Sequence, residues 1–177
     1  MIEFKTTETL IELEQILALQ SKNIPINLTE VDKKEQGFVT VQHDLRILRR
    51  MHNVHAHSIA TSGGDVIGYA LSMSKQFRGD IPVLTPMFTE IDSSRKSKSN
   101  YIIMGQVCVD RAYRGKGVFR GLYAKMRDTF TAKYDCIITE IDALNIRSIN
   151  DHKAIGFEEL VRYDCNNKIW VVVYMDI

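Results

Sequence analysis

The sequence lacks an excess of charge, a cysteine framework and any long apolar run. Its 23 basic and 22 acidic residues nearly cancel, so no overall electrostatic field favours nucleic acid or an anionic membrane as a partner. Three cysteines, Cys108, Cys136 and Cys165, are too few and too scattered for a disulfide framework or a zinc cluster. No apolar stretch approaches the roughly 18 residues that span a bilayer, and the N-terminus has no apolar signal region. We therefore expect a cytoplasmic protein that binds neither nucleic acid nor membrane.

Two clusters of polar residues do not, by themselves, predict a binding site. His55 and His57 form a His-x-His pattern, but no third ligand at a sensible spacing completes a metal centre, and we expect no metal. Arg46, Arg49 and Arg50 lie largely off the apolar stripe of a predicted helix. We interpret these arginines as a solvated face, with contact to an acidic substrate or a nucleotide phosphate as the alternative.

What is present is the pattern of one α/β domain spanning residues 1–177. With 45% hydrophobic residues, the chain is long and apolar enough to bury a core. Stretches with the period of a strand alternate with stretches whose apolar residues recur at helical spacing, and there is no internal repeat. The predicted strands are residues 2–4, 57–61, 66–74, 101–110, 136–143, 157–164 and 168–175, and the predicted helices are residues 7–22, 41–53, 118–133 and 145–155.

Residues 76–100 contain two prolines and then the polar run DSSRKSKSN, and we interpret them as an irregular segment. A loop of this length inside a compact domain is usually functional or mobile. Its apolar first half suggests a lid or one wall of a substrate pocket.

Residues 105–128 carry the clearest chemical signal, because a strand pattern leads through a glycine-bearing turn directly into a helix pattern. Gly115 and Gly117 alternate with Arg114 and Lys116 at the predicted start of the helix. A helix start offers unpaired N–H groups and the positive end of the helix dipole, and glycines let an anion approach the backbone closely. The turn is therefore predicted to bind a phosphate or a pyrophosphate.

Two common phosphate-binding patterns fit this turn poorly. The Walker sequence GxxxxGK[ST] is absent, which argues against an NTPase. Gly115, Gly117 and Gly121 spell GxGxxxG after a strand, as in a dinucleotide site. However, that motif usually opens a long doubly wound unit, and only about 60 residues follow it here. An NAD(P)-binding protein is therefore a remote alternative.

A second segment, one strand downstream, changes the interpretation. YRGKGVF at 113–119 is followed by NIRSINDHKAIGF at 145–157, and together these segments resemble the GNAT superfamily of acetyl-coenzyme A-dependent N-acetyltransferases. Arg114 and Gly117 match the family's Arg/Gln-x-x-Gly-x-Gly/Ala signature, whereas Phe119 stands where glycine or alanine is usual. The second signature is matched in order and spacing by Asn145, Ser148, His152, Gly156 and Phe157.

The resemblance implies a fold and a cofactor site. The fold is a mixed, mostly antiparallel central sheet flanked by helices, with a parallel strand pair splayed at the cofactor site. The cofactor is acetyl-coenzyme A, acting as co-substrate, and a backbone N–H near Val109 would polarise its thioester carbonyl. The residues implied to bind it are Val107, Cys108 and Val109 along the pantetheine arm, Arg114, Gly115, Lys116, Gly117, Val118 and Phe119 at the pyrophosphate, and Asn145 and Ser148 on the following helix.

Proton transfer is the remaining chemical role. His152 stands where the family often has a tyrosine that protonates the departing thiolate; we hold open that it only packs or hydrogen-bonds there. Glu140, with Asp142 on the same strand face, is the candidate base for the incoming amine, and Tyr101 and Glu90 are weaker candidates. Because Cys108 should alternate to the opposite face from Val107 and Val109, we interpret its thiol as part of the core rather than as a nucleophile.

The sequence therefore predicts an N-acyltransferase that moves an acetyl group to a primary amine by direct attack in a ternary complex. The acceptor would be a small-molecule or peptide amine, and a homodimer is a candidate assembly. The alternative from another functional class is a module of the same fold that binds acyl-coenzyme A as a sensor or partner without catalysis.

Overall fold

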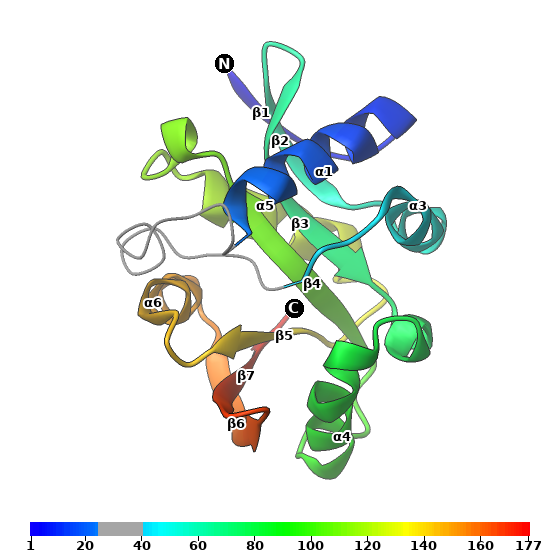
Figure 1. The fold of residues 1–177 in the computed structure, drawn as a ribbon, viewed down its shortest axis with the longest axis vertical. Coiled ribbons are helices and arrows are strands. Elements are labelled where there is room, and N and C mark those ends of the chain that lie inside the picture. The colour runs from blue at the N-terminus through cyan, green and yellow to red at the C-terminus, as the bar shows by residue number, and fades with distance from the viewer. Residues whose placement is uncertain (25–40) are drawn as a thin grey trace.

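The protein is built around one seven-stranded sheet, and the computed structural model describes residues 1–24 and 41–177. The strand order is β1-β2-β3-β4-β5-β7-β6, and every neighbouring pair is antiparallel except β4 and β5, which are parallel (Figure 1). The strands are β1 (Ile2–Thr6), β2 (Ser58–Ser62), β3 (Asp65–Met73), β4 (Tyr101–Val109), β5 (Cys136–Asp142), β6 (Glu158–Cys165) and β7 (Lys168–Asp176). The expected mixed and mostly antiparallel α/β fold is confirmed.

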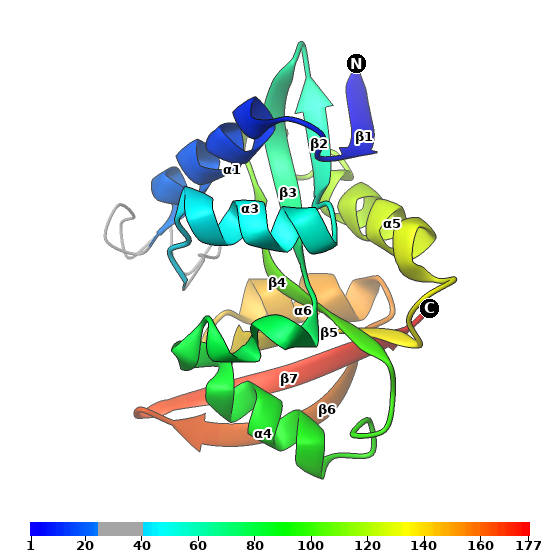
Figure 2. The same ribbon diagram turned by 90° about the vertical axis from the view of Figure 1, so that its right-hand side faces the viewer.

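Helices cover both faces of this sheet, and the sheet separates two apolar clusters. Three helices bury their apolar side chains on one face: α1 (Leu10–Asn23), α3 (Leu45–Val54) and α4 (Thr85–Ser93). Two helices, α5 (Val118–Phe130) and α6 (Ile146–Ala154), do so on the other face. Figure 2 shows α1 and α3 on the opposite side of β2 and β3 from α5. We call these the α1 face and the α5 face of the sheet. Among the described residues, no helix is long and apolar enough to cross a membrane.

Side-chain caps set where the first two helices begin. The Thr9 hydroxyl accepts the Glu12 N–H at 3.2 Å and the Glu12 carboxylate accepts the Thr9 N–H at 2.9 Å, which forms a capping box. Asp44 caps α3 in the same way by accepting the Ile47 N–H at 2.8 Å. A capping residue lies outside the helical dihedrals, so α1 starts three residues later and α3 four residues later than the apolar spacing predicts.

The two hairpins turn through residues with left-handed backbone, as their sequences predict. Gly63 and Gly64 join β2 to β3 with φ values of 63° and 90°. Asn166 and Asn167 join β6 to β7 with φ values of 54° and 59°, and asparagine tolerates this region better than most residues. Successive positive φ values are typical of the tight turns whose twist matches that of paired strands.

The segment 76–100 differs from the expectation of an irregular loop, which is wrong. It contains two short 3-10 turns, Lys75–Gly79 and Pro82–Leu84, and then α4. The prolines suggested a loop, but Pro86 lies in the first turn of α4, where a missing N–H costs nothing. Four residues at helical spacing are buried on the α1 face: Leu84, Met87, Phe88 and Ile91.

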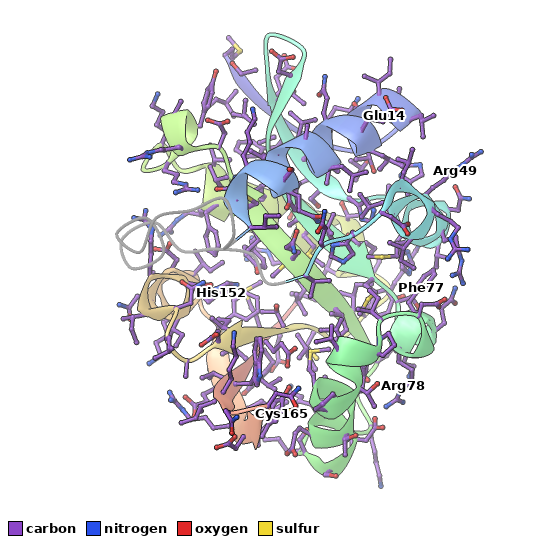
Figure 3. The ribbon with its side chains drawn as sticks, in the orientation of Figure 1. Glu14, Arg49, Phe77, Arg78, His152 and Cys165 are labelled. Carbon is purple, nitrogen blue, oxygen red and sulfur yellow. The ribbon has the colours of Figure 1, made fainter. Side chains whose placement is uncertain are left out.

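The arginines of α3 are exposed, as predicted for a solvated face. Arg46 and Arg49 lie on the outer side of the helix, and Figure 3 shows Arg49 on the side of the molecule away from His152. Arg50 forms an ion pair with Asp80 at 2.5 Å, and its guanidinium lies over the Phe77 ring. These contacts belong to the surface around α3 rather than to a binding site near α6.

The feature that matters most for function is the short contact between β4 and β5. They pair only from Tyr101 to Ile103 on β4 and from Cys136 to Ile138 on β5. Beyond these residues β5 continues its ladder with β7 up to Asp142, while β4 stays with β3 and carries one extra residue between Met104 and Val107. The two strands therefore diverge, and the sheet opens between them (Figure 1).

Close packing of α5 on β3 gives a testable prediction. A Cβ added to Gly68 on β3 would lie 2.9 Å from a methyl carbon of Val118 and 3.3 Å from the Cys108 carbonyl oxygen. We expect Gly68→Ala to lower the free energy of unfolding by about 1–3 kcal/mol through overpacking, measured by urea denaturation. Gly79→Ala is the matched control, because its Cβ would have no neighbour within 4 Å. Equal stability of the two variants would show that α5 does not pack this tightly.

Candidate active site

The anion loop predicted at residues 113–119 has the backbone geometry that such a site needs. After β4, Asp110 caps a short 3-10 turn by accepting the Ala112 N–H at 2.9 Å. Gly115 and Gly117 then adopt φ values of 72° and 78°, and α5 begins at Val118 with Gly117 as its N-cap. A Cβ at either glycine would have no protein atom within 4 Å. The two glycines therefore leave open space in front of the N–H groups at the start of α5.

A cavity of about 280 Å³ adjoins this loop. One wall is the anion loop and the end of β4, and the other is the N-terminal half of α6 together with Ala154 and Ile155. Arg120 and Arg147 add positive charge to the lining. Backbone donors, left-handed glycines and cations are the chemical groups that bind a pyrophosphate. The residues present therefore fit the phosphate portion of coenzyme A.

Arg114 makes its hydrogen bonds inside the protein. Its Nε donates to the Val109 carbonyl at 2.9 Å, and its terminal nitrogen donates to the Asn23 amide oxygen at 2.7 Å. Burial, together with the charges of Arg147 and Arg111, lowers the pKa of the Arg114 guanidinium. Arg114 thus connects the end of α1 to the end of β4. Its positive charge also contributes to the electrostatic potential at the anion loop. The ammonium of Lys116 lies over the Tyr113 ring, 5.2 Å from its centroid.

A second, smaller cavity of about 60 Å³ lies in the opening between β4 and β5. Its lining includes Gly105 and Gln106 on β4, where the extra residue of that strand falls, and Glu140 on β5. Three residues line both cavities: Val107, Asn145 and Ser148. The anion loop and Glu140 are therefore the two ends of one continuous site.

Glu140 has the properties of a proton acceptor that works near neutral pH. Burial raises the pKa of its carboxyl to about 7, because the charged form loses water. The hydroxyl of Tyr163 on β6 donates a hydrogen bond to Glu140 Oε2 at 2.5 Å, which favours the ionised form and opposes part of that rise. A carboxyl poised near pH 7 in a cleft is a candidate general base.

The other candidate bases are less suitable. Asp142 is buried and fully engaged, since it accepts the Leu144 N–H at 2.9 Å and forms an ion pair with Lys168 at 3.2 Å. Tyr101 is buried in the core on the α1 face, where the Lys75 ammonium lies over its ring. Glu90 lies on α4, close enough to Tyr163 to affect its pKa. Within residues 1–24 and 41–177, Glu140 alone among the four lines the smaller cavity and has no cationic partner.

His152 lies on α6 (Figure 3), and its ring is held by hydrogen bonds to Ser148 of α6 and Tyr123 of α5. Its Nδ1 lies 2.7 Å from the Ser148 carbonyl oxygen, which can only accept, so Nδ1 carries the proton. Its Nε2 then accepts the Tyr123 hydroxyl at 2.6 Å. Burial lowers the pKa of His152 to about 4, so a second proton is absent near neutral pH. The geometry therefore favours packing and hydrogen bonding over the general-acid role that the sequence also suggested.

Phe119, the departure from the family signature, is part of the same cluster. Its ring lies 5.1 Å from the rings of both Tyr123 and His152, in tilted and edge-on arrangements. Phe157 completes the cluster at 5.1 Å from Tyr123 and from His152. Such edge-on pairs stabilise beyond their buried area. Phe119 thus ties the first turn of α5 to α6 while lining the larger cavity.

Cys108 lies on the α1 face, and Val107 and Val109 pack on the α5 face, as the alternation of the strand predicts. Burial raises the pKa of the Cys108 thiol to about 12. A thiol that stays protonated is a poor nucleophile. Gly121, the third glycine of the dinucleotide-like pattern, faces the Phe4 ring of β1, where a Cβ would overlap it. Its role is packing rather than cofactor binding.

Sequence reasoning missed Tyr163, Asn23 and Trp170 as residues of the site. Tyr163 and Trp170 stand opposite each other on β6 and β7, and Asn23 ends α1. None belongs to a motif, and each reaches the site only through the sheet order or the packing of α1. The aromatic residues in two paired strands were the only signal available.

The lock on His152 gives a second testable prediction. His152→Phe should lower the free energy of unfolding by about 1–3 kcal/mol, because the buried Tyr123 hydroxyl loses its acceptor. In the double variant His152→Phe/Tyr123→Phe both polar groups are gone, so the loss should be smaller than the sum of the two single losses. Urea denaturation of the four proteins measures this coupling. Strictly additive losses would show that the hydrogen bond does not contribute.

Comparison with known proteins agrees with this geometry. The sequence profile of the Acetyltransferase (GNAT) family matches residues 19–157. A search of curated protein sequences finds no match. Among solved structures, the ribosomal-protein-S18-alanine N-acetyltransferase from Escherichia coli is similar with a TM-score of 0.67 at 12% identity, over 100% of this chain and 94% of that chain.

Two further structures show the same fold. The NatC complex bound to Gag peptide and CoA superposes with a TM-score of 0.66 at 16% identity, covering 99% of this chain and 98% of that chain. An N-acetyltransferase from Staphylococcus aureus Mu50 gives a TM-score of 0.63 at 16% identity, covering 99% of this chain and 98% of that chain. The family profile covers most of the chain, and the fold is shared along nearly its full length. The protein belongs to the GNAT acetyltransferase family.

Proposed function

We propose that the protein transfers an acetyl group from acetyl-coenzyme A to a primary amine by direct attack, with Glu140 as the general base. The observation that carries this proposal is the continuity of the site. The cavity at the anion loop and the cavity at Glu140 share Val107, Asn145 and Ser148 as lining residues. A long cofactor with a phosphate end and a reactive end fits such an arrangement.

Each part of the site has a binding role in this proposal. The N–H groups of residues 115–119 and the nearby cations hold the pyrophosphate. The edge of β4 beyond Ile103, which β5 leaves unpaired, offers backbone groups to the pantetheine arm. When bound, acetyl-coenzyme A supplies a thioester carbonyl that an amine can attack. A backbone N–H of β4 donates to the carbonyl oxygen and stabilises the negative charge that develops there.

Glu140 handles the proton of the acceptor. A protonated amine cannot attack, so its ammonium gives a proton to the Glu140 carboxylate. With its pKa near 7, this carboxyl is substantially ionised at neutral pH and still basic enough to accept a proton. His152 contributes no proton in this scheme, because its Nδ1–H is given to the Ser148 carbonyl. As the carbon–sulfur bond breaks, the departing thiolate of coenzyme A instead takes up the second proton that the attacking nitrogen loses, and it leaves as the free thiol.

The acceptor is a primary amine of a small molecule or a peptide. The solved NatC complex contains a Gag peptide and CoA, which supports a peptide amine as one kind of acceptor that this fold accommodates. Trp170 and Glu140 on the α1 face of the opening give the acceptor side an aromatic surface and a carboxyl.

A non-catalytic module that binds acyl-coenzyme A is the second candidate. It is favoured by the buried hydrogen bonds that hold His152 neutral at the position where the family usually has a proton donor. The two candidates differ in thiol release. An enzyme releases free coenzyme A from acetyl-coenzyme A in the presence of a suitable amine, whereas a sensor binds the cofactor and releases none. A thiol assay across a panel of small amines and short peptides separates the two.

Cofactor binding can be tested without knowing the acceptor. We expect calorimetry to detect binding of coenzyme A to the intact protein. Gly117→Asp should abolish it, because the carboxylate would occupy the open space in front of the helix N-terminus and φ would be strained. Gly79→Asp, exposed and remote from the loop, is the control and should bind normally. No binding to the intact protein, or equal binding by Gly117→Asp, would contradict a coenzyme A site at the anion loop.

The role of Glu140 predicts opposite effects on activity and stability. Activity should rise with pH through about 7 as Glu140 loses its proton, and Glu140→Gln should lower turnover by roughly 10²-fold or more. The folded-state pKa lies above the unfolded value of 4.5, so the unfolded state ionises first and stability falls as pH rises from 4.5 to about 7. At pH 8, Glu140→Gln should therefore be more stable by on the order of 3 kcal/mol. Turnover unchanged by the substitution would remove Glu140 from the mechanism.

A further inference from the structure

Tyr163 makes a contact that the architecture does not require. It lies on β6, two strands away from Glu140 on β5, with β7 between them. Tyr163 pairs with Trp170 on β7, whereas Glu140 pairs with Val172. Neighbouring strands lie about 4.8 Å apart, so the phenol crosses β7 on the α1 face and meets the carboxylate that points toward it. Only a long side chain that ends in a hydrogen-bond donor can do this.

The hydrogen bond itself is short and has a fixed direction. The Tyr163 hydroxyl lies 2.5 Å from Glu140 Oε2, a distance typical of a hydroxyl that donates to a carboxylate. Burial, followed by the hydrogen bond and the charge of Glu140, raises the pKa of Tyr163 well above its ordinary value. The phenol therefore keeps its proton and donates at every working pH. Among the described residues, no other hydrogen bond to the Glu140 side chain is formed, which leaves Oε1 available.

We propose that Tyr163 is a positioning residue, which holds Oε2 of Glu140 and thereby orients Oε1 toward the acceptor amine. This inference rests on the proposed function, in which Glu140 is the base. Tyr163 lies outside residues 19–157, the part of the chain that the family profile matches. The family profile itself therefore does not assign this contact.

The surrounding charges leave this contact as the main specific influence on Glu140. The Asp142 carboxylate is compensated by Lys168, and His152 is neutral near pH 7. Glu90 on α4 and Cys165 on β6 act on Tyr163, and both raise the pKa of the phenol. Burial raises the pKa of Glu140, and the hydrogen bond from the Tyr163 hydroxyl lowers that pKa. Loss of the hydroxyl should therefore make Glu140 hold its proton to a higher pH.

Tyr163→Phe removes only the hydroxyl. We expect the rising limb of kcat/KM against pH to move up by about one pH unit, with activity largely recovered at high pH and KM for acetyl-coenzyme A unchanged. A purely structural role would lower stability without moving the limb. Tyr174→Phe is the matched control, because the Tyr174 hydroxyl also donates to a carboxylate, the exposed Glu158 at 2.7 Å, and Tyr174 lines neither cavity. Its pH profile should match that of the unsubstituted protein.

A second measurement needs no acceptor. Infrared difference spectra against pH follow the carboxylic C=O band of Glu140, identified as the band that Glu140→Gln removes. In Tyr163→Phe this band should titrate at higher pH, and in Tyr174→Phe it should not move. If Tyr163→Phe turns over substrate with an unchanged kcat/KM–pH profile and an unchanged titration of the Glu140 band, Tyr163 does not position Glu140. A shifted band in a protein that never releases thiol supports the link between Tyr163 and Glu140 and overturns the transferase instead.

Discussion

The site depends on the separation of β4 from β5 after three paired residues. β5 is bound along its whole length to β7, from Cys136 to Asp142, and β4 is bound to β3 with an extra residue between Met104 and Val107. Each strand thus belongs to its own half of the sheet, and the halves twist apart. The opening exposes strand edges that a closed sheet would bury, and α5 begins at one end of it. A phosphate cradle and a carboxyl base can therefore share one continuous space.

Buried polar contacts frame this opening on every side. On the β4 side, the Gln106 side-chain oxygen accepts from Gln20 at 2.8 Å and from the Tyr69 hydroxyl at 2.7 Å. On the β5 side, Tyr163 holds Glu140, and behind the cofactor path Tyr123 holds His152. Satisfied polar networks of this kind fix a single arrangement, while each unpaired member would be costly. Glu140 is in a different situation, because its burial opposes the charge that the proposed chemistry needs. In the proposed mechanism, the folded protein loses some stability at Glu140 and gains a base that works near neutral pH.

The elements and the anion loop could be predicted from the sequence because their causes are local. Gly115 and Gly117 permit left-handed backbone, and β-branched periodicity indicates a strand, wherever they occur. The expectation of an irregular loop over residues 76–100 is wrong, because Pro86 lies in the first turn of α4, where proline is compatible with a helix. The state of His152 and the contact of Tyr163 could not be predicted. Both depend on which side chains the sheet order and the helix packing bring together, and no spacing in the sequence reports that.

A crystal structure of the protein with coenzyme A tests the proposed function most directly. We predict that the pyrophosphate lies against the backbone N–H groups of residues 115–119. The pantetheine arm should pass Val107 and Asn145, and the thiol should lie in the opening between β4 and β5 beside Glu140. Coenzyme A bound at another surface, or bound with its thiol directed away from Glu140, would contradict this.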